Sequence, residues 1–129
     1  MKAYLIDILN HVYKPIDLIE HNKTDTEQLH QIYSLLNCKV IDIVQRFIGD
    51  EVFSFIVDDN YLMTHRQHYD FSYIDKNCSC SLFGNLLITR PANIDGDLVS
   101  LSDDDCIFIS NHLRTITTRF GKRQIVTEF

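Results

Sequence analysis

Two histidines and two cysteines lie close enough along the chain to suggest a metal site. They are His65 and His68, spaced as H-x-x-H, followed by Cys78 and Cys80, spaced as C-x-C. Zinc binds four nitrogen or sulfur ligands in a tetrahedral array, so all four residues are candidate ligands. The C-x-C spacing is shorter than in most structural zinc sites, and loop histidines with ordinary thiols are the simpler explanation.

The same residues are also candidates for a nucleophilic site, in which a cysteine thiolate lies beside a histidine base. Either cysteine of the C-x-C pair with either histidine would supply the groups, although no motif fixes their geometry. The serine-hydrolase motif G-x-S-x-G and the glycine-rich phosphate-binding motifs are absent from this sequence of four glycines. A small zinc- or thiol-dependent enzyme is therefore one hypothesis that stays open.

Aromatic side chains alternate with cationic or titratable ones between residues 61 and 73. The members of this stretch are Tyr61, His65, Arg66, His68, Tyr69, Phe71 and Tyr73. Aromatic rings stack on nucleobases and arginine or histidine binds phosphate, so the pattern favours a nucleotide pocket. Asn85 and Arg90, near the apolar run 83–89, are expected to add polar contacts. The alternative is an exposed loop whose tyrosines pack on one another.

Two acidic runs could bind a hard metal ion, but solvated turn and helix-cap residues explain them better. Asp58 and Asp59 end a strand, and the run 103–105 suits the positive end of a helix. The basic stretch near the carboxyl end forms a solvated face or steers a partner. It contains Arg114, Arg119, Lys122 and Arg123.

The element around which we expect the fold to form is a β-hairpin over residues 39–57, with its turn at Gly49 and Asp50. A three-residue loop over 48–50 would set Phe47 opposite Glu51. That register is favoured because it gathers large apolar residues on one buried face. These residues are Ile41, Ile43, Phe47, Phe53, Phe55 and Val57.

Two helices are predicted, at about residues 25–37 and 103–115. The first follows a capping box over 24–27 and ends at Asn37, and the second is capped by Ser102 and presents Cys106, Ile109 and Leu113 inward.

Strands are predicted at 3–8, 13–19, 71–74, 83–89 and 98–101, and Pro15 confines the second of these to a sheet edge or to the start of a strand. Residues 120–129 are expected to form a tail or an edge strand. The sequence thus predicts one α+β domain spanning 1–129, with an antiparallel or mixed sheet and both helices on one face.

Composition excludes several classes of protein. The chain has 129 residues, of which 45% are hydrophobic and 23% charged, and its net charge is −6. An acidic surface argues against general nucleic-acid binding, and no apolar run approaches the roughly 20 residues of a membrane span. Nothing indicates secretion, so the four cysteines are expected to be reduced thiols in a cytoplasm.

Several short pieces, taken in order, resemble a family of small proteins from bacteriophages and mobile elements that is known only as a domain of unknown function. They are the opening MKAYLID over residues 1–7, the capped helix leading into a Val/Ile strand, VDDNYL over 57–62, FGNLLI over 83–88, and the Asp/Ser-rich entry to the last helix. The resemblance covers residues 1–115. It implies a phage or mobile-element origin and a role against host defences.

Three functions follow as hypotheses. The first is a non-enzymatic binding protein, without a cofactor, that sequesters a small nucleotide signal near residues 61–73. The second is an inhibitor that binds a host defence protein through an exposed face, and the third is the zinc- or thiol-dependent enzyme. A homo-oligomer is expected, because small sequestering proteins often build pockets between protomers.

Overall fold

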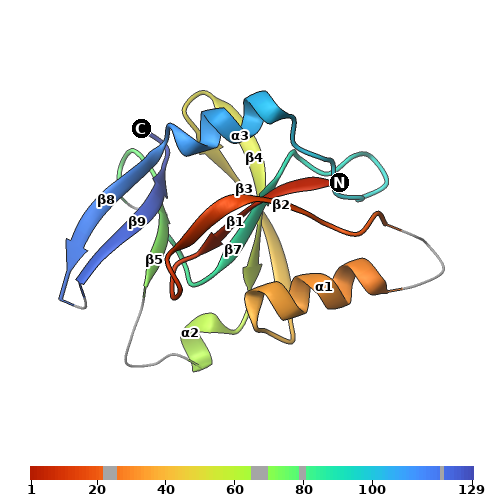
Figure 1. Ribbon diagram of the computed structural model, residues 1–129, viewed down its shortest axis with the longest axis horizontal. Helices are drawn as coiled ribbons and strands as arrows, with labels where there is room; N and C mark the ends of the chain where they lie inside the picture. Colours follow the sequence, from red (N-terminus) through yellow and green to blue (C-terminus); the bar gives the residue numbers. More distant parts are fainter. Residues whose placement is uncertain (22–25, 65–69, 79–80, 120) are drawn as a thin grey trace.

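The computed structural model describes residues 1–21, 26–64, 70–78, 81–119 and 121–129. These residues form one α+β domain built on two β-sheets (Figure 1). The predicted fold class is therefore confirmed, but the prediction of a single sheet is wrong.

The first sheet has five strands in the order β2-β1-β7-β4-β3, and every neighbouring pair is antiparallel. Its strands are β1 (Lys2–Asp7), β2 (Val12–Asp17), β3 (Ile41–Ile48), β4 (Glu51–Asp58) and β7 (Leu86–Thr89). The second sheet has four strands in the order β6-β5-β9-β8, and it is mixed because β5 and β9 are parallel. Its strands are β5 (Phe71–Ile74), β6 (Ser81–Phe83), β8 (Leu113–Thr118) and β9 (Gly121–Thr127).

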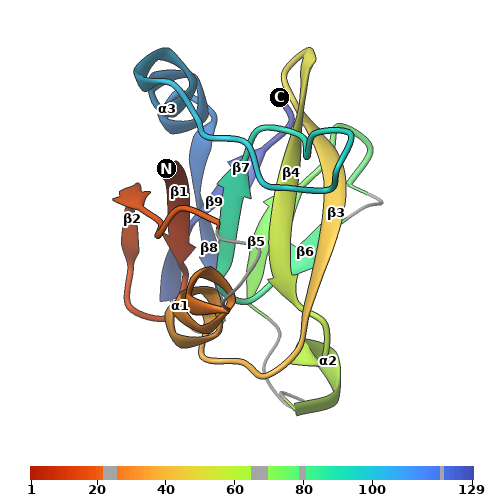
Figure 2. The same ribbon diagram turned by 90° about the vertical axis from the view of Figure 1, so that its right-hand side faces the viewer.

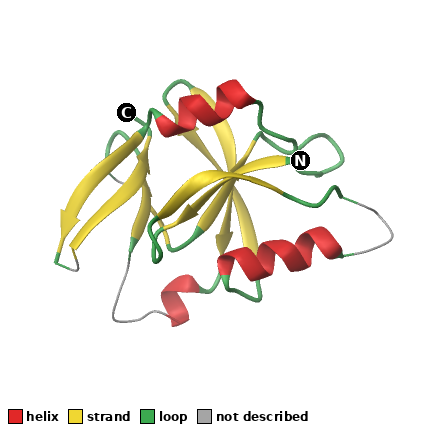
Figure 3. Ribbon diagram, viewed as in Figure 1, coloured by secondary structure: helices red, strands yellow, loops and turns green. Residues whose placement is uncertain are grey.

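The helices lie against opposite faces of the five-stranded sheet, so the prediction that both share one face is wrong. Alternate residues of β1 show the two faces: Leu5 packs with α1 (Glu27–Leu36), whereas Tyr4 and Ile6 pack with α3 (Asp103–Ser110). The second sheet lies on the α3 side, because Tyr73 and Val126 of that sheet pack with Ile109 of α3 (Figure 2). Figure 3 shows the helices in red and the strands of both sheets in yellow. The central strands are therefore covered on both faces.

The β3–β4 hairpin has a two-residue turn at Gly49 and Asp50, and not the predicted three-residue loop. Ile48 pairs with Glu51, and Phe47 pairs with Val52 instead of Glu51. The predicted register assumed that only one face of the hairpin is buried. In β4 the residues from Phe53 to Ile56 are all buried, because one face meets α1 and the other meets the second sheet. A strand that is covered on both faces carries apolar residues on both faces, and not on alternate positions only.

As a result, the six apolar residues predicted to share one buried face of the hairpin are not all buried together. Phe53 and Phe55 are fully buried, but Ile43 and Phe47 on the partner strand are exposed. Both exposed residues lie on β3, which is the outer strand of the sheet.

Three further predicted elements differ in the structure. The predicted strand 83–89 is two strands, β6 and β7, which belong to different sheets and are separated by Gly84 and Asn85. The second helix ends at Ser110, and Leu113 begins β8 instead of extending the helix. Residues 98–101 form only a single bridge, between Val99 and Arg90.

The carboxyl-terminal segment is neither a tail nor an edge strand. It forms β9, which lies between β5 and β8 inside the second sheet. Its residues Ile125, Val126 and Thr127 are buried. The edge position predicted from Pro15 is confirmed, because β2 is the outer strand on its side of the first sheet.

The start of α3 and the end of α1 are formed by the residues that the sequence predicts. Ser102 caps α3 by accepting a hydrogen bond from the Asp105 backbone N–H at 3.0 Å, and the Asp105 side chain accepts from the Ser102 N–H at 2.9 Å. Asn37 ends α1 in the left-handed conformation, with φ of 50°. Both predictions are confirmed. The N-cap of α1 is Thr26, not Thr24, which lies outside the described residues.

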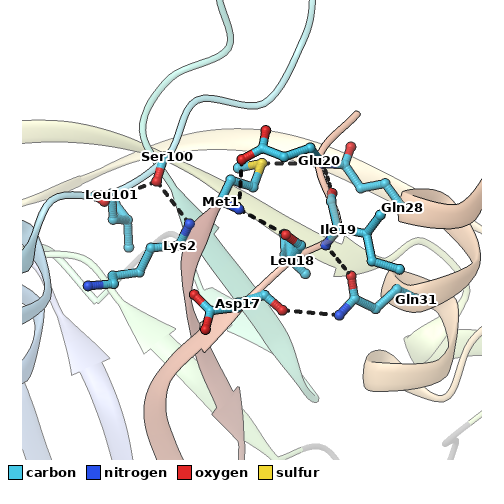
Figure 4. Close-up of polar contacts among 10 residues, drawn as sticks. All are labelled: Met1, Lys2, Asp17, Leu18, Ile19, Glu20, Gln28, Gln31, Ser100 and Leu101. Atoms are coloured by element: carbon cyan, nitrogen blue, oxygen red, sulfur yellow. Dashed lines mark hydrogen bonds and ion pairs between the residues drawn. The ribbon is translucent and has the colours of Figure 1, made fainter. Parts of the chain in front are cut away.

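Backbone and amide hydrogen bonds fix α1 beside the end of β2. The Gln31 side chain donates to the Asp17 carbonyl at 3.1 Å and accepts from the Ile19 N–H at 2.7 Å (Figure 4). On the other side of β1, the Lys2 N–H donates to the Ser100 hydroxyl at 2.8 Å. The Gln31 bonds hold α1 beside the end of β2, and the Lys2 bond holds the segment before α3 beside β1.

Candidate functional site

Three polar residues form a row at one end of the five-stranded sheet. Strands β1 and β4 are both antiparallel to β7, so they are parallel to each other and end at the same edge. Leu86, the first residue of β7, pairs with Ile6 on one side and Val57 on the other. One residue further along, Asp7, Asn85 and Asp58 therefore lie side by side. With strands about 4.8 Å apart, the two aspartates are about 10 Å apart.

This row faces α1. Side chains alternate between the faces of a sheet, and the preceding row of Ile6, Leu86 and Val57 packs on the α3 side. The aspartates and Asn85 therefore point to the same side as Leu5 and α1, where a cleft of about 400 Å³ opens. We call it the row cleft. It is lined by Leu5, Asp7, Leu9, Asn10, Ser34, Leu35, Leu36, Asn37, Asp58, Tyr61 and Asn85.

The row cleft is electronegative. It holds two carboxylates, and the described residues that line it include no lysine, arginine or histidine. The carbonyl end of α1 adds partial negative charge, because the helix ends at Leu36 and Asn37 lines the cleft. A ligand in this cleft is favoured when it presents hydrogen-bond donors or positive charge.

Local hydrogen bonds hold the polar groups of the row in place. The Asp7 carboxylate accepts from the Asn10 backbone N–H and from the Asn10 side chain, both at 3.0 Å. The Asp58 carboxylate accepts from the Asn60 N–H at 2.9 Å, and the Asn85 oxygen accepts from the Ile8 N–H at 3.0 Å. Each carboxylate oxygen has more than one lone pair, so these bonds orient the groups and leave further acceptor capacity.

Tyr61, the first residue of α2 (Tyr61–Thr64), is brought to the row cleft together with Asn85. These are two of the residues predicted to contact a ligand. The Tyr61 hydroxyl accepts from the Asp70 backbone N–H at 3.3 Å, and its ring lies directly over Gly84. Burial raises the pKa of Tyr61, because it disfavours the charged phenolate.

Tyr73 belongs to the core and not to a ligand site. It is fully buried, its ring meets that of Phe55 edge-on at a centroid distance of 5.0 Å, and its hydroxyl donates to the Phe47 carbonyl at 2.6 Å. The tyrosine therefore ties β5 to β3 across the two sheets.

A Tyr73→Phe variant is expected to lower the free energy of unfolding by about 1–2 kcal/mol, because it leaves a carbonyl without its buried partner. Urea unfolding followed by circular dichroism measures the change. Ligand affinity at the row cleft should be the same as in the wild type. A variant as stable as the wild type would show that this hydrogen bond does not connect the sheets.

Arg90 is held by acidic side chains and an aromatic ring. It donates to both carboxylate oxygens of Asp105, at 2.8 and 3.1 Å, and pairs with Glu51 at 2.9 Å. Its guanidinium carbon lies 4.9 Å from the centre of the Phe53 ring. Arg90 is not among the residues that line the row cleft, and its contacts join α3 to β4.

The remaining predicted ligand contacts fall outside the described residues. These are His65, Arg66, His68 and Tyr69, and Cys80 of the metal set lies outside as well. Cys78 is an exposed turn residue with φ of 54°. Within the described ranges, no three histidine, cysteine or acidic side chains are grouped to hold a metal ion. The predicted zinc set and the aromatic pocket over 65–69 stay predictions.

Two other thiols are poor nucleophiles. Burial raises the pKa of Cys106, and burial together with the Asp58 carboxylate raises the pKa of Cys38. Both therefore carry less thiolate at neutral pH than an unperturbed cysteine does.

The basic stretch is distributed over the β8–β9 hairpin. Arg114 is on β8, and Lys122 and Arg123 are on β9. Arg123 lies 3.7 Å from the Asp70 carboxylate, whereas Lys122 is exposed. In the part of the chain that the structure describes, no helix has the length and apolarity needed to cross a membrane.

Sequence reasoning missed Asp7, Asn10 and Asn37 as residues of the site. Asp7 and Asp58 share one signal, because each directly follows an apolar strand segment. That signal identifies a strand end, but it does not say which strands are neighbours.

Comparisons with protein-family models, with curated proteins and with solved structures found no match. The resemblance to the phage and mobile-element family stays a prediction carried by the motifs of residues 1–115.

Proposed function

We propose that this chain is a non-enzymatic binding protein that holds a small ligand in the row cleft. The observation that supports the proposal is the convergence of acceptor groups from separate elements on one cavity. Asp7 comes from β1, Asp58 from β4 and Asn85 from the turn before β7, and α1 closes the opposite wall. A concave site with a few fixed polar groups is the usual form of a small-molecule site.

The charge of the row cleft determines which end of a ligand enters it. Two carboxylates and a helix carbonyl end repel phosphate, so a nucleotide would enter by its sugar or base. Ribose hydroxyls and nucleobase amino groups donate hydrogen bonds, which Asp7 and Asp58 accept. Leu9 and Leu35, which line the cleft and are not buried, offer an apolar surface for a base.

The proposed role is sequestration. A protein that only holds a nucleoside-type signal lowers its free concentration in proportion to the number of sites. This role is the one that the resemblance to phage and mobile-element proteins would give the chain, acting against a host defence signal.

The first test asks whether the protein holds a small molecule. Native mass spectrometry of protein purified under mild conditions should show an added mass that denaturation releases. Isothermal titration calorimetry against adenosine, guanosine, their 5′-monophosphates and a cyclic dinucleotide should then show saturable binding, with the nucleoside portion sufficient for affinity.

A matched pair of variants tests the placement of the site. Asp58→Asn removes one charge inside the row cleft, and we expect about a tenfold loss of affinity because a hydrogen bond to a charged group is lost. Asp59→Asn removes the same charge from the next residue, which is exposed and does not line this cleft. Its affinity should change by less than twofold. Equal effects in both variants, or no bound molecule at all, would contradict the proposal.

A second candidate function is binding to a host protein. The observation that favours it is a pair of exposed apolar residues on α2, Leu62 and Met63, beside an apolar groove. The groove has a volume of about 230 Å³ and is lined by Asp42, Val44, Val57, Asp58, Asp59, Tyr61, Leu62, Ser81, Leu82 and Phe83. Under this function a Leu62→Ser/Met63→Ser variant would lose a stoichiometric partner in a pull-down without losing ligand affinity.

A further inference from the structure

Strand β3 is the outer strand of the five-stranded sheet and one of its longest. A two-residue turn makes Ile48 and Glu51 a hydrogen-bonded pair, so even-numbered residues of β3 bond to β4. The odd-numbered residues, from Ile41 to Phe47, therefore direct their backbone N–H and C=O groups away from β4. One of these groups, the Phe47 carbonyl, already accepts from the Tyr73 hydroxyl at 2.6 Å and would have to use its second lone pair in any further pairing. Exposed edges of this kind are templates for pairing with another strand.

Two charged side chains of β3 bond to those outward groups in the isolated chain. The Asp42 carboxylate accepts from the Ile43 N–H at 2.9 Å, and the Arg46 guanidinium donates to the Gln45 carbonyl at 2.8 Å. Within the described residues, the Arg46 Nε is buried without a hydrogen-bond partner. The guanidinium is therefore only partly satisfied. A carboxylate of another chain could bind it once the side chain leaves the Gln45 carbonyl and exposes its N–H groups.

The spacing of these two charges selects one register for pairing with a second copy of the strand. In an antiparallel pair centred on Val44, Asp42 of each copy lies opposite Arg46 of the other. Centring the pair on Asp42 or on Arg46 would instead place like charges opposite each other, which is destabilising. Centring it on residue 43 or 45 would leave both charges opposite uncharged residues.

The same register satisfies the backbone and buries apolar surface. It pairs residue 43 with residue 45 of the other copy, so the two backbones supply the hydrogen bonds that Asp42 and Arg46 make in the isolated chain. The freed side chains then pair across the interface. On the α1 side, Ile41 meets Phe47 of the other copy, and Phe47 is 53% exposed in the single chain.

We propose that two copies of this chain associate through β3, antiparallel and centred on Val44, to form one continuous ten-stranded sheet. The interface is isologous, as a twofold dimer requires, because each copy contributes both members of the charge pair. This inference is independent of the row cleft and of any ligand.

Sedimentation velocity over micromolar to millimolar concentrations tests the proposal with two charge-reversal variants. Asp42→Arg places arginine opposite arginine, and Arg46→Asp places aspartate opposite aspartate. Each single variant should raise the dimer dissociation constant by about ten- to thirtyfold, since two attractive pairs become repulsive. An equimolar mixture of the two variants restores opposite charges at both positions, so it should form a heterodimer about as tight as the wild type.

A third variant separates loss of pairing from loss of folding. Gln45→Pro removes an outward-facing N–H without removing a bond to β4, and proline is tolerated on edge strands. The variant should be folded by circular dichroism and monomeric. A monomeric wild type, or single variants that associate more strongly than the wild type, would overturn the proposal. Either result would show that Asp42 and Arg46 prevent β3 from pairing with another strand.

Discussion

A Gly84→Ala variant is expected to lose about 2–4 kcal/mol of its free energy of unfolding. Gly84 has φ of +75°, a conformation that disfavours any side chain. A Cβ atom would also lie 2.6 Å from two carbons of the Tyr61 ring. The ring has little room to move away, because Tyr61 is buried and its hydroxyl accepts from the Asp70 N–H.

Gly96→Ala is a matched control for this prediction. Gly96 has φ of +82°, but among the described residues no atom beyond Gly96 and its two chain neighbours lies within 4 Å of the position that a Cβ would occupy. The Gly96→Ala variant should therefore lose only about 1 kcal/mol of its free energy of unfolding, from the unfavourable backbone conformation alone. Urea unfolding of both variants measures the difference. Equal losses would mean that the Tyr61 ring does not rest on Gly84, and the wall of the row cleft would be wrongly placed.

An Asp105→Ala variant is expected to lose about 2–3 kcal/mol of its free energy of unfolding. The substitution removes the carboxylate that accepts from the Ser102 N–H at the start of α3 and from Arg90 at two positions. Arg90 would keep only Glu51 as an acidic partner among the described residues. Chemical unfolding measures the loss.

Asp104→Ala is the control, because it removes the same charge from the first turn of the same helix at an exposed position. It should cost about 0.5 kcal/mol or less. A similar loss in both variants would show that the negative charge near the helix end matters and that the bonds to Arg90 do not.

The contribution of Asp105 should depend on pH. Burial acts to raise the pKa of Asp105, but hydrogen bonds from Ser102 and Arg90 outweigh it, so the pKa lies below its ordinary value. A group with a lowered pKa in the folded state stabilises the fold above its unfolded pKa, and that stabilisation is lost as the pH falls through the folded pKa. The stability difference between wild type and Asp105→Asn should therefore be constant near neutral pH and shrink below about pH 4.

Local signals in the sequence predicted the parts of the fold that local chemistry controls. The turn at Gly49, the left-handed Asn37 and the Ser102 cap of α3 each follow from one or two residues. The register of the hairpin did not follow, because it depends on whether one face or both faces are covered. That information lies in the second sheet, whose strands β5 and β6 have four and three residues and carry little periodicity of their own.

The candidate site was predicted only in part, for a related reason. Tyr61 and Asn85 do meet at one cleft, although 24 positions separate them in the sequence. Tyr73 and Arg90 were predicted as ligand contacts because one is aromatic and the other cationic. In the folded chain Tyr73 instead bonds to Phe47 and Arg90 to Asp105, and the sequence does not show that these partners are near. The row of Asp7, Asn85 and Asp58 requires the strand order β1-β7-β4, which no local pattern indicates.

The central claim is that the row cleft is a ligand site, and mapping a titration by nuclear magnetic resonance tests it most directly. Amide resonances would be followed in the wild-type protein while the nucleoside or nucleotide that binds in calorimetry is added. The account predicts that the largest shifts fall on Asn10, Asn37 and Asn85. Shifts of that size confined to Leu82 and Phe83 in the apolar groove beside α2, or to the β8–β9 hairpin, with the row cleft unchanged, would contradict it.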